Sequence, residues 1–150
     1  MSLKTELVIF DWDGTLYNSV GQIVASLQHA AEEHKLTLTD KAAKSIIGLG
    51  LPEVMQTLFP EVPDLHDSIL KAYGDHYIAN STNDAWFEGI SELLHDLKAQ
   101  GLKLAVATGK NRRGLDRVIA KTQSTHLFDV TRAANETRSK PDPLMLQEIL

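Results

Sequence analysis

The feature that most constrains the fold is a change of pattern along the chain. Residues 5–10 form a short apolar run typical of a buried strand, but from about 17 to 83 the apolar residues recur only at helical spacing. From Gly89 onward, predicted helices and strands alternate. Alternation of this kind is typical of parallel βαβ units. We therefore predict an α/β domain made of residues 1–16 and 84–150, interrupted by an all-helical domain of residues 17–83.

Turn and capping residues delimit the individual elements. Helices are predicted after Asn18 or Ser19, from Thr39 or Asp40 through Ile47, after Pro52, after a capping Asp64, over 90–97, over 112–121 and from Pro143. Strands are predicted at 5–10, 102–108 and 128–131.

Composition excludes several classes of protein. The chain has no cysteine, so it has neither disulfides nor thiolate sites. Its net charge of −5 and the lack of a basic stripe argue against nucleic acid as a partner. No apolar stretch is long enough to span a membrane, and the N-terminus does not resemble a secretory signal, so we expect a cytoplasmic protein.

Polar side chains follow three predicted strands at the point where each strand ends. Asp11 and Asp13 come after the first strand, Thr108 and Gly109 after the second, and Lys140 lies beyond the third. Ligands of open α/β sheets bind at this edge. Paired carboxylates can hold a divalent metal or divide nucleophilic and acid–base work, and a hydroxyl, a backbone amide and an ammonium can hold an anion. The sequence therefore predicts a site for phosphate and metal.

Other polar and aromatic residues receive a plainer interpretation. A solvated helix start explains Lys110 and Asn111 as well as a functional role does, and we assign them none. We expect Tyr73 and Tyr77 in the core of the helical domain, and we expect the Trp12 ring to pack away from the acids. The six histidines show no metal-ligand spacing.

Three segments resemble the first three motifs of the haloacid dehalogenase superfamily. They are Asp11–Leu16 (DWDGTL), Ala107–Lys110 (ATGK) and Ser139–Pro143 (SKPDP). Asn18-Ser19 and the Gly48–Pro52 turn are similar to its phosphoglycolate-phosphatase-like branch. The resemblance covers essentially the whole chain. It implies a Rossmann-like parallel sheet core with an inserted small helical cap.

The resemblance also implies roles for matching residues. Asp11 would attack phosphorus and form an aspartyl-phosphate, and Asp13 would act as general acid and then as general base. Thr108 and the Gly109 amide would bind phosphoryl oxygens, while Lys140 would offset negative charge. Mg²⁺ would bind to the Asp11 carboxylate and the Asp13 main-chain carbonyl. We expect a small phosphorylated metabolite as substrate and a monomer or homodimer.

An acid at position 13 favours phosphate-ester hydrolysis over dehalogenation, because displacement of a halide needs no proton donor. The family's fourth motif, which completes its metal site, has no counterpart before Leu150. We therefore expect that the C-terminal part of the core is missing and that the chain is a fragment of a longer protein. Two alternatives stay open: a catalytically impaired phosphate- or metal-binding or regulatory module, and a sugar-phosphate mutase.

Overall fold

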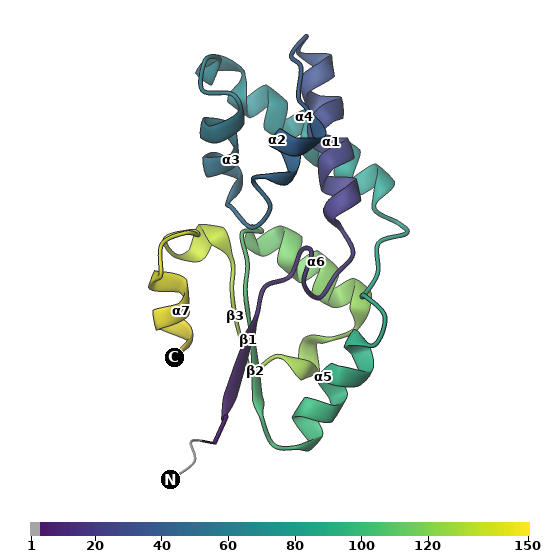
Figure 1. The fold of residues 1–150 in the computed structure, drawn as a ribbon, viewed down its shortest axis with the longest axis vertical. Coiled ribbons are helices and arrows are strands. Elements are labelled where there is room, and N and C mark those ends of the chain that lie inside the picture. The colour runs from purple at the N-terminus through teal and green to yellow at the C-terminus, as the bar shows by residue number, and fades with distance from the viewer. Residues whose placement is uncertain (1–3) are drawn as a thin grey trace.

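The computed structural model describes residues 4–150, in which a small parallel sheet lies below a group of helices (Figure 1). The sheet has the order β1-β2-β3, with strands Leu7–Phe10, Lys103–Ala107 and Val130–Arg132. Val8 lies opposite Leu104 on β2, and Ala105 lies opposite Val130 on β3. The predicted α/β fold with a parallel sheet is confirmed.

Helices cover both faces of the sheet. α5 (Ile90–Ala99) and α6 (Arg112–Thr122) cover one face, and α7 (Leu144–Ile149) covers the other (Figure 1). Since successive side chains of a strand point to opposite faces, Leu104 and Val106 pack toward α5 and α6, whereas Ala105 and Ala107 pack toward α7. The small alanines allow α7 to lie close to the sheet.

The remaining α-helices form a second hydrophobic cluster above the sheet. They are α1 (Val20–Glu33), α2 (Asp40–Lys44), α3 (Leu51–Leu58) and α4 (His66–Asn80). α1 packs along α4, and buried residues of both helices belong to the same hydrophobic cluster. No strand lies between residues 17 and 83. Short 3-10 helices occur at Pro63–Leu65, Thr125–Leu127 and Ala134–Glu136.

Two predicted elements differ from those observed. The helix expected through Ile47 ends at Lys44. Residues 45–48 form turns instead, and the last of them, Gly48, has a positive φ of 97°, which a helix does not allow. Asp64 does not cap α4 but lies inside a 3-10 helix that precedes it. The predicted helix start at Thr39 or Asp40 is confirmed: α2 begins at Asp40, and the Thr39 hydroxyl caps it by accepting a hydrogen bond from the Ala42 amide at 3.1 Å.

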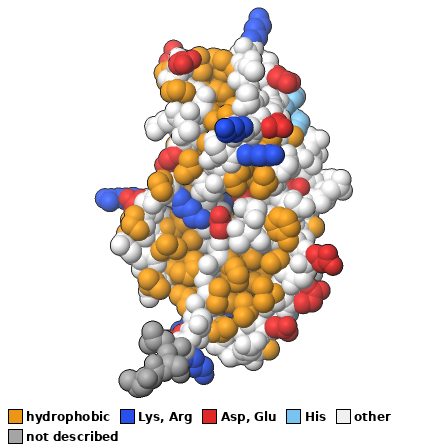
Figure 2. Space-filling view, in the orientation of Figure 1, with side chains coloured by type: hydrophobic (Ala, Val, Ile, Leu, Met, Phe, Trp, Pro, Cys, Tyr) orange, Lys and Arg blue, Asp and Glu red, His pale blue; other side chains and the backbone are white. Residues whose placement is uncertain are grey.

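Hydrophobic side chains gather over the lower half of the face shown in Figure 2. Within residues 4–150, β1 is an edge strand that pairs only with β2, and all of its residues are half-buried. Across the same residues, every helix is too short or too polar to cross a membrane.

Candidate active site

The first acid of the site lies directly after β1. Asp11 Oδ1 accepts a hydrogen bond from the Trp12 amide at 2.7 Å and lies 3.1 Å from Lys140 Nζ. The Asp11 side chain is 33% exposed, so it can meet a ligand from solution. Lys140 comes from the loop before α7 and precedes a cis proline. The structure thus joins the first and third motifs in one ion pair.

The second acid has different partners. Asp13 Oδ1 accepts a hydrogen bond from Ser19 Oγ at 2.6 Å and another from Lys110 Nζ at 3.2 Å. Ser19 is fully buried, and the Lys110 side chain is only 11% exposed. Two donors therefore hold the same oxygen of Asp13, which fixes the orientation of the carboxylate.

Thr108 and Gly109, the predicted phosphate-binding residues, follow directly after β2. Thr108 is buried, its amide donates to the Arg132 carbonyl, and its Oγ1 accepts from the Lys110 amide at 3.1 Å. Gly109 is also buried. A Cβ at Gly109 would lie 2.5 Å from the carbonyl oxygens of both Gly48 and Leu49, so only glycine fits there.

The turn between α2 and α3 separates two cavities. One, of about 430 Å³, is lined by Asp11 and Lys140, and the other, of about 960 Å³, is lined by Asp13 and Lys110. Residues 47–49 line both cavities. The structure therefore joins the predicted Asp11 and Lys140 in one ion pair and joins Asp13 to Lys110, which was not predicted, in another. Of the other predicted residues, Gly109 lines the larger cavity and Thr108 lines neither.

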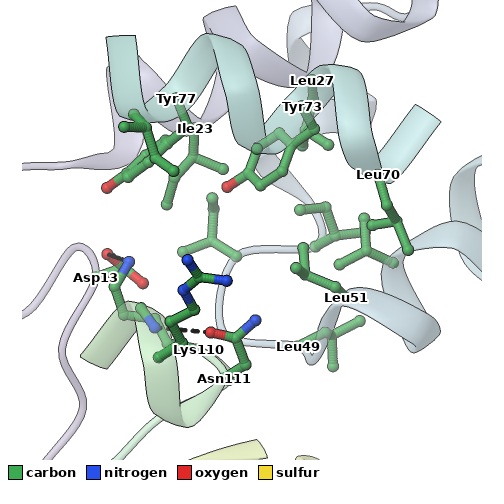
Figure 3. A pocket seen from close by; sticks show the side chains of 18 of the residues that line it. Asp13, Ile23, Leu27, Leu49, Leu51, Leu70, Tyr73, Tyr77, Lys110 and Asn111 are labelled. Carbon is green, nitrogen blue, oxygen red and sulfur yellow. Dashed lines mark hydrogen bonds and ion pairs between the residues drawn. The ribbon is translucent and has the colours of Figure 1, made fainter. Parts of the chain in front are cut away.

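The helices above the sheet close the larger cavity. Figure 3 shows Tyr73 and Tyr77 of α4 opposite Asp13 and Lys110. Burial raises the pKa of both tyrosines well above the usual range, and the nearby charge of Asp13 raises it further. Both hydroxyls therefore stay protonated at neutral pH. Burial also raises the pKa of Asp84, whose Oδ2 accepts from the Tyr77 hydroxyl at 3.4 Å.

Two residues at this site carry contacts that the sequence did not predict. The solvated interpretation of Lys110 is wrong, because its ammonium is nearly buried against Asp13 and the Tyr77 ring. Ser19 is the residue before α1, yet its side chain makes no capping hydrogen bond and serves Asp13 instead. The only sequence feature that could have pointed to the role of Lys110 is its positive charge directly after Thr108 and Gly109.

Other expectations for this region can be compared with the structure. The Trp12 ring packs away from the acids, with its centroid 5.1 Å from that of Trp86 and 6.0 Å from that of Phe128. Asn111 caps α6 by accepting from the Gly114 amide at 2.7 Å. Tyr77 lies in the hydrophobic core of helices α1 to α4 (the upper helices), as expected, although it also lines the larger cavity.

The chemistry of the donor set suits Mg²⁺, which takes hard oxygen ligands and keeps several positions for water and phosphate. The Asp11 carboxylate is partly exposed, and no described residue donates a hydrogen bond to the Asp13 main-chain carbonyl. These two oxygens could hold the ion. Residues 4–150 contain no cluster of three or more acidic or histidine side chains arranged to bind a metal.

Comparison with known proteins agrees with the resemblance carried by the three sequence motifs. A family model described as haloacid dehalogenase-like hydrolase matches residues 8–150. The chain is 30% identical to a phosphoglycolate phosphatase from Mannheimia succiniciproducens, an alignment that covers 97% of this chain and 70% of that protein.

The chain is also 31% identical to the tyrosine-protein kinase PtkA of Mycobacterium tuberculosis, over 90% of its own length and 46% of that protein. It therefore spans about half the length of this relative. Among solved structures, one described as a haloacid dehalogenase-like hydrolase from Bacteroides fragilis superposes with a TM-score of 0.86 at 27% identity. That alignment covers 97% of this chain and 71% of the other.

Proposed function

Because this chain belongs to the haloacid dehalogenase-like hydrolases, as its motifs predicted, we propose that it hydrolyses a phosphate monoester with Mg²⁺ through an aspartyl-phosphate. The phosphoglycolate phosphatase relatives support a small phosphorylated substrate. We also infer that residues 1–16 and 84–150 act as the catalytic core and that residues 17–83 act as its cap.

The observation that carries the proposal is the different surroundings of the two acids. Asp11 is partly exposed and forms an ion pair with Lys140, which suits a nucleophile that must reach phosphorus. Asp13 is held by Ser19 and Lys110 and lines a separate cavity, which suits a proton donor to the leaving oxygen.

The proposed reaction has two displacements. A carboxylate oxygen of Asp11 attacks phosphorus, the ester P–O bond breaks, and Asp13 gives its proton to the leaving alkoxide. Water then attacks the aspartyl-phosphate, Asp13 removes the water proton, and the bond between phosphorus and the Asp11 oxygen breaks to release phosphate. Thr108 and the Gly109 amide bind phosphoryl oxygens, while Lys140 balances the charge on Asp11.

Mg²⁺ would be held by the Asp11 carboxylate and the Asp13 main-chain carbonyl, and when bound it offsets the negative charge of the phosphoryl oxygens. Lys140 already supplies one positive charge 3.1 Å from Asp11 Oδ1. We therefore expect phosphate binding without the metal to be weakened rather than abolished.

The direct test is phosphate release from a panel of phosphate monoesters, with and without Mg²⁺, for the wild type and Asp11→Asn. We expect Mg²⁺-dependent turnover that is lost in Asp11→Asn, since the amide cannot attack phosphorus. Asp67→Asn removes an exposed acid in the first turn of α4 and serves as the matched control. Unchanged turnover in Asp11→Asn would refute the nucleophile, and binding of inorganic phosphate without any turnover would favour a binding module.

A further inference from the structure

We propose that the larger cavity is the binding site for the leaving group and that it selects phosphate monoesters of bulky, mainly apolar alcohols. This inference rests on the proposed function, because it assigns a substrate class to the same site. It goes beyond that function, since glycolate, the leaving group of phosphoglycolate, is small and would leave most of the cavity empty.

The wall of the cavity on the side of helices α1, α3 and α4 is mainly aliphatic, and the two charged residues that also line it, Lys71 and Asp75, are exposed and paired with each other. Side chains from α1, α4 and the segment from the turn to the start of α3 contribute to it (Figure 3): Ile23, Leu27, Leu49, Leu51 and Leu70. Burying apolar surface of a ligand against such a wall is favourable. A polar leaving group would lose its water without gaining partners there.

The two partly buried cations that line the cavity, Lys110 and Arg117, already have partners. Lys110 is paired with Asp13, and its Nζ lies 5.1 Å from the centroid of the Tyr77 ring. Arg117 lies 5.5 Å from the same ring and donates to Ser81 Oγ at 3.3 Å. Arg113 also lines the cavity but is exposed. An anionic leaving group would have to displace existing contacts at Lys110 and Arg117, and could otherwise meet only the solvent-screened charge of Arg113, whereas an apolar group displaces none of these contacts.

The size of the cavity also favours a bulky group. Its volume of about 960 Å³ lies near the upper end of the range for small-molecule sites. Tyr73 adds a protonated hydroxyl that points into this space and can donate to a single polar atom of a ligand. The combination fits an alcohol that is mostly hydrocarbon with few polar atoms.

The position of Asp13 connects the cavity to the reaction. Asp13 lines the larger cavity, whereas Asp11 and Lys140 line the smaller one beyond the turn of residues 47–49. If Asp13 protonates the leaving oxygen, the carbon skeleton attached to that oxygen extends from Asp13 toward the aliphatic wall. The phosphoryl group then lies between Asp11, which attacks it, and Gly109, which lines the larger cavity.

A series of primary alkyl phosphates from ethyl to hexyl, together with phosphoglycolate, tests this selectivity. The leaving alcohols of the series differ little in reactivity, so kcat/KM reports mainly on binding of the chain. We expect kcat/KM to rise about fourfold for each methylene that is buried. Hexyl phosphate should then exceed phosphoglycolate by more than tenfold. A flat or falling series, or a preference for phosphoglycolate, would overturn the inference.

A pair of variants ties the effect to the cavity. Leu70→Asn places an amide in the aliphatic wall and should remove most of the dependence on chain length. Leu93→Asn makes the same change at an exposed position of α5 and should leave that dependence intact. If both variants show the wild-type dependence, the wall does not contact the leaving group and the inference is wrong.

Binding of alkylphosphonates, measured by calorimetry, separates this inference from the proposed function. These probes cannot be hydrolysed at the P–C bond, so their Kd depends on the cavity and not on turnover. Failure of every ester to react would refute the proposed function. The preference of the cavity for apolar chains would still be supported if hexylphosphonate bound at least tenfold more tightly than ethylphosphonate, and it would be refuted if the two bound equally.

Discussion

At the scale of single residues, the site depends on how Asp13 is held. Ser19 and Lys110 both donate to Oδ1, which leaves Oδ2 free of side-chain partners among residues 4–150. In the proposed reaction, the proton passes through one oxygen of this carboxylate. Ser19 is therefore a positioning residue, because it acts through Asp13 and not on substrate.

Replacing Ser19 with alanine should lower kcat about tenfold and change KM less than twofold. The reason is that a hydrogen bond to a charged group, worth about 1.5 kcal/mol, no longer orients the carboxylate. Ser19→Thr keeps the hydroxyl and should restore most of the rate. Steady-state kinetics of both variants measure this. A raised KM with unchanged kcat would contradict the positioning role.

The partners of Asp13 could not be predicted from sequence, although both acids and Lys140 could. The position of Asp11 follows from an apolar strand that ends at a Gly-Thr turn. Asp13 and Lys110 are 97 positions apart in the sequence. Their pairing depends on how close the fold brings the turn after β1 to the start of α6. Local patterns carry no information on such a distance.

At the scale of elements, the turn between α2 and α3 lies against the end of β2. Its carbonyl groups at Gly48 and Leu49 leave no room for a side chain at position 109. This contact brings the upper helices onto the predicted phosphate-binding residues. The sequence indicated a break at this turn but not its contact with Gly109.

Substituting Gly109 with alanine should push this turn away from β2. We expect a loss of about 1–3 kcal/mol in the free energy of unfolding, typical of overpacking, together with reduced phosphatase activity. Urea denaturation measures the first effect. Gly21→Ala is the matched control, since a Cβ there meets no atom within 4 Å, and it should not destabilise the protein. Equal stability of the two variants would show that the turn adapts freely.

At the scale of the whole molecule, Asp129 links α5 to the sheet. Its carboxylate accepts from Lys98 Nζ at 2.8 Å and from the Leu104 amide at 2.9 Å. The hydrogen bond from Lys98, followed by that from Leu104, lowers the pKa of Asp129. A carboxyl whose pKa is lower in the folded state stabilises the fold above its unfolded pKa, and this stabilisation is lost as the pH falls through the folded pKa.

Replacing Asp129 with asparagine should therefore reduce stability at pH 7 and have less effect at pH 3. After allowance for solvent screening, the expected loss at pH 7 is about 0.5–1 kcal/mol. Urea denaturation at both pH values tests this, with the exposed Glu61→Gln as control. A loss of the same size at both pH values would mean that the ion pair is not its source.

The general architecture was readable from the sequence because strands, helices and their alternation leave periodic patterns. The two cavities were not, since they arise from how the upper helices meet the sheet. Leu70 and Tyr73 look like ordinary residues of a helix core, and only the structure shows that they line the same cavity as Asp13.

In the proposed reaction, Asp11 forms a covalent intermediate with the phosphoryl group of the substrate. Acid quenching of a reaction with excess phosphate ester, followed by peptide mass spectrometry, tests it most directly. We expect one added phosphoryl group on the peptide that contains Asp11, stable in acid and released by hydroxylamine. Its absence in a sample that is turning over, or its attachment to another residue, would show that Asp11 is not the nucleophile.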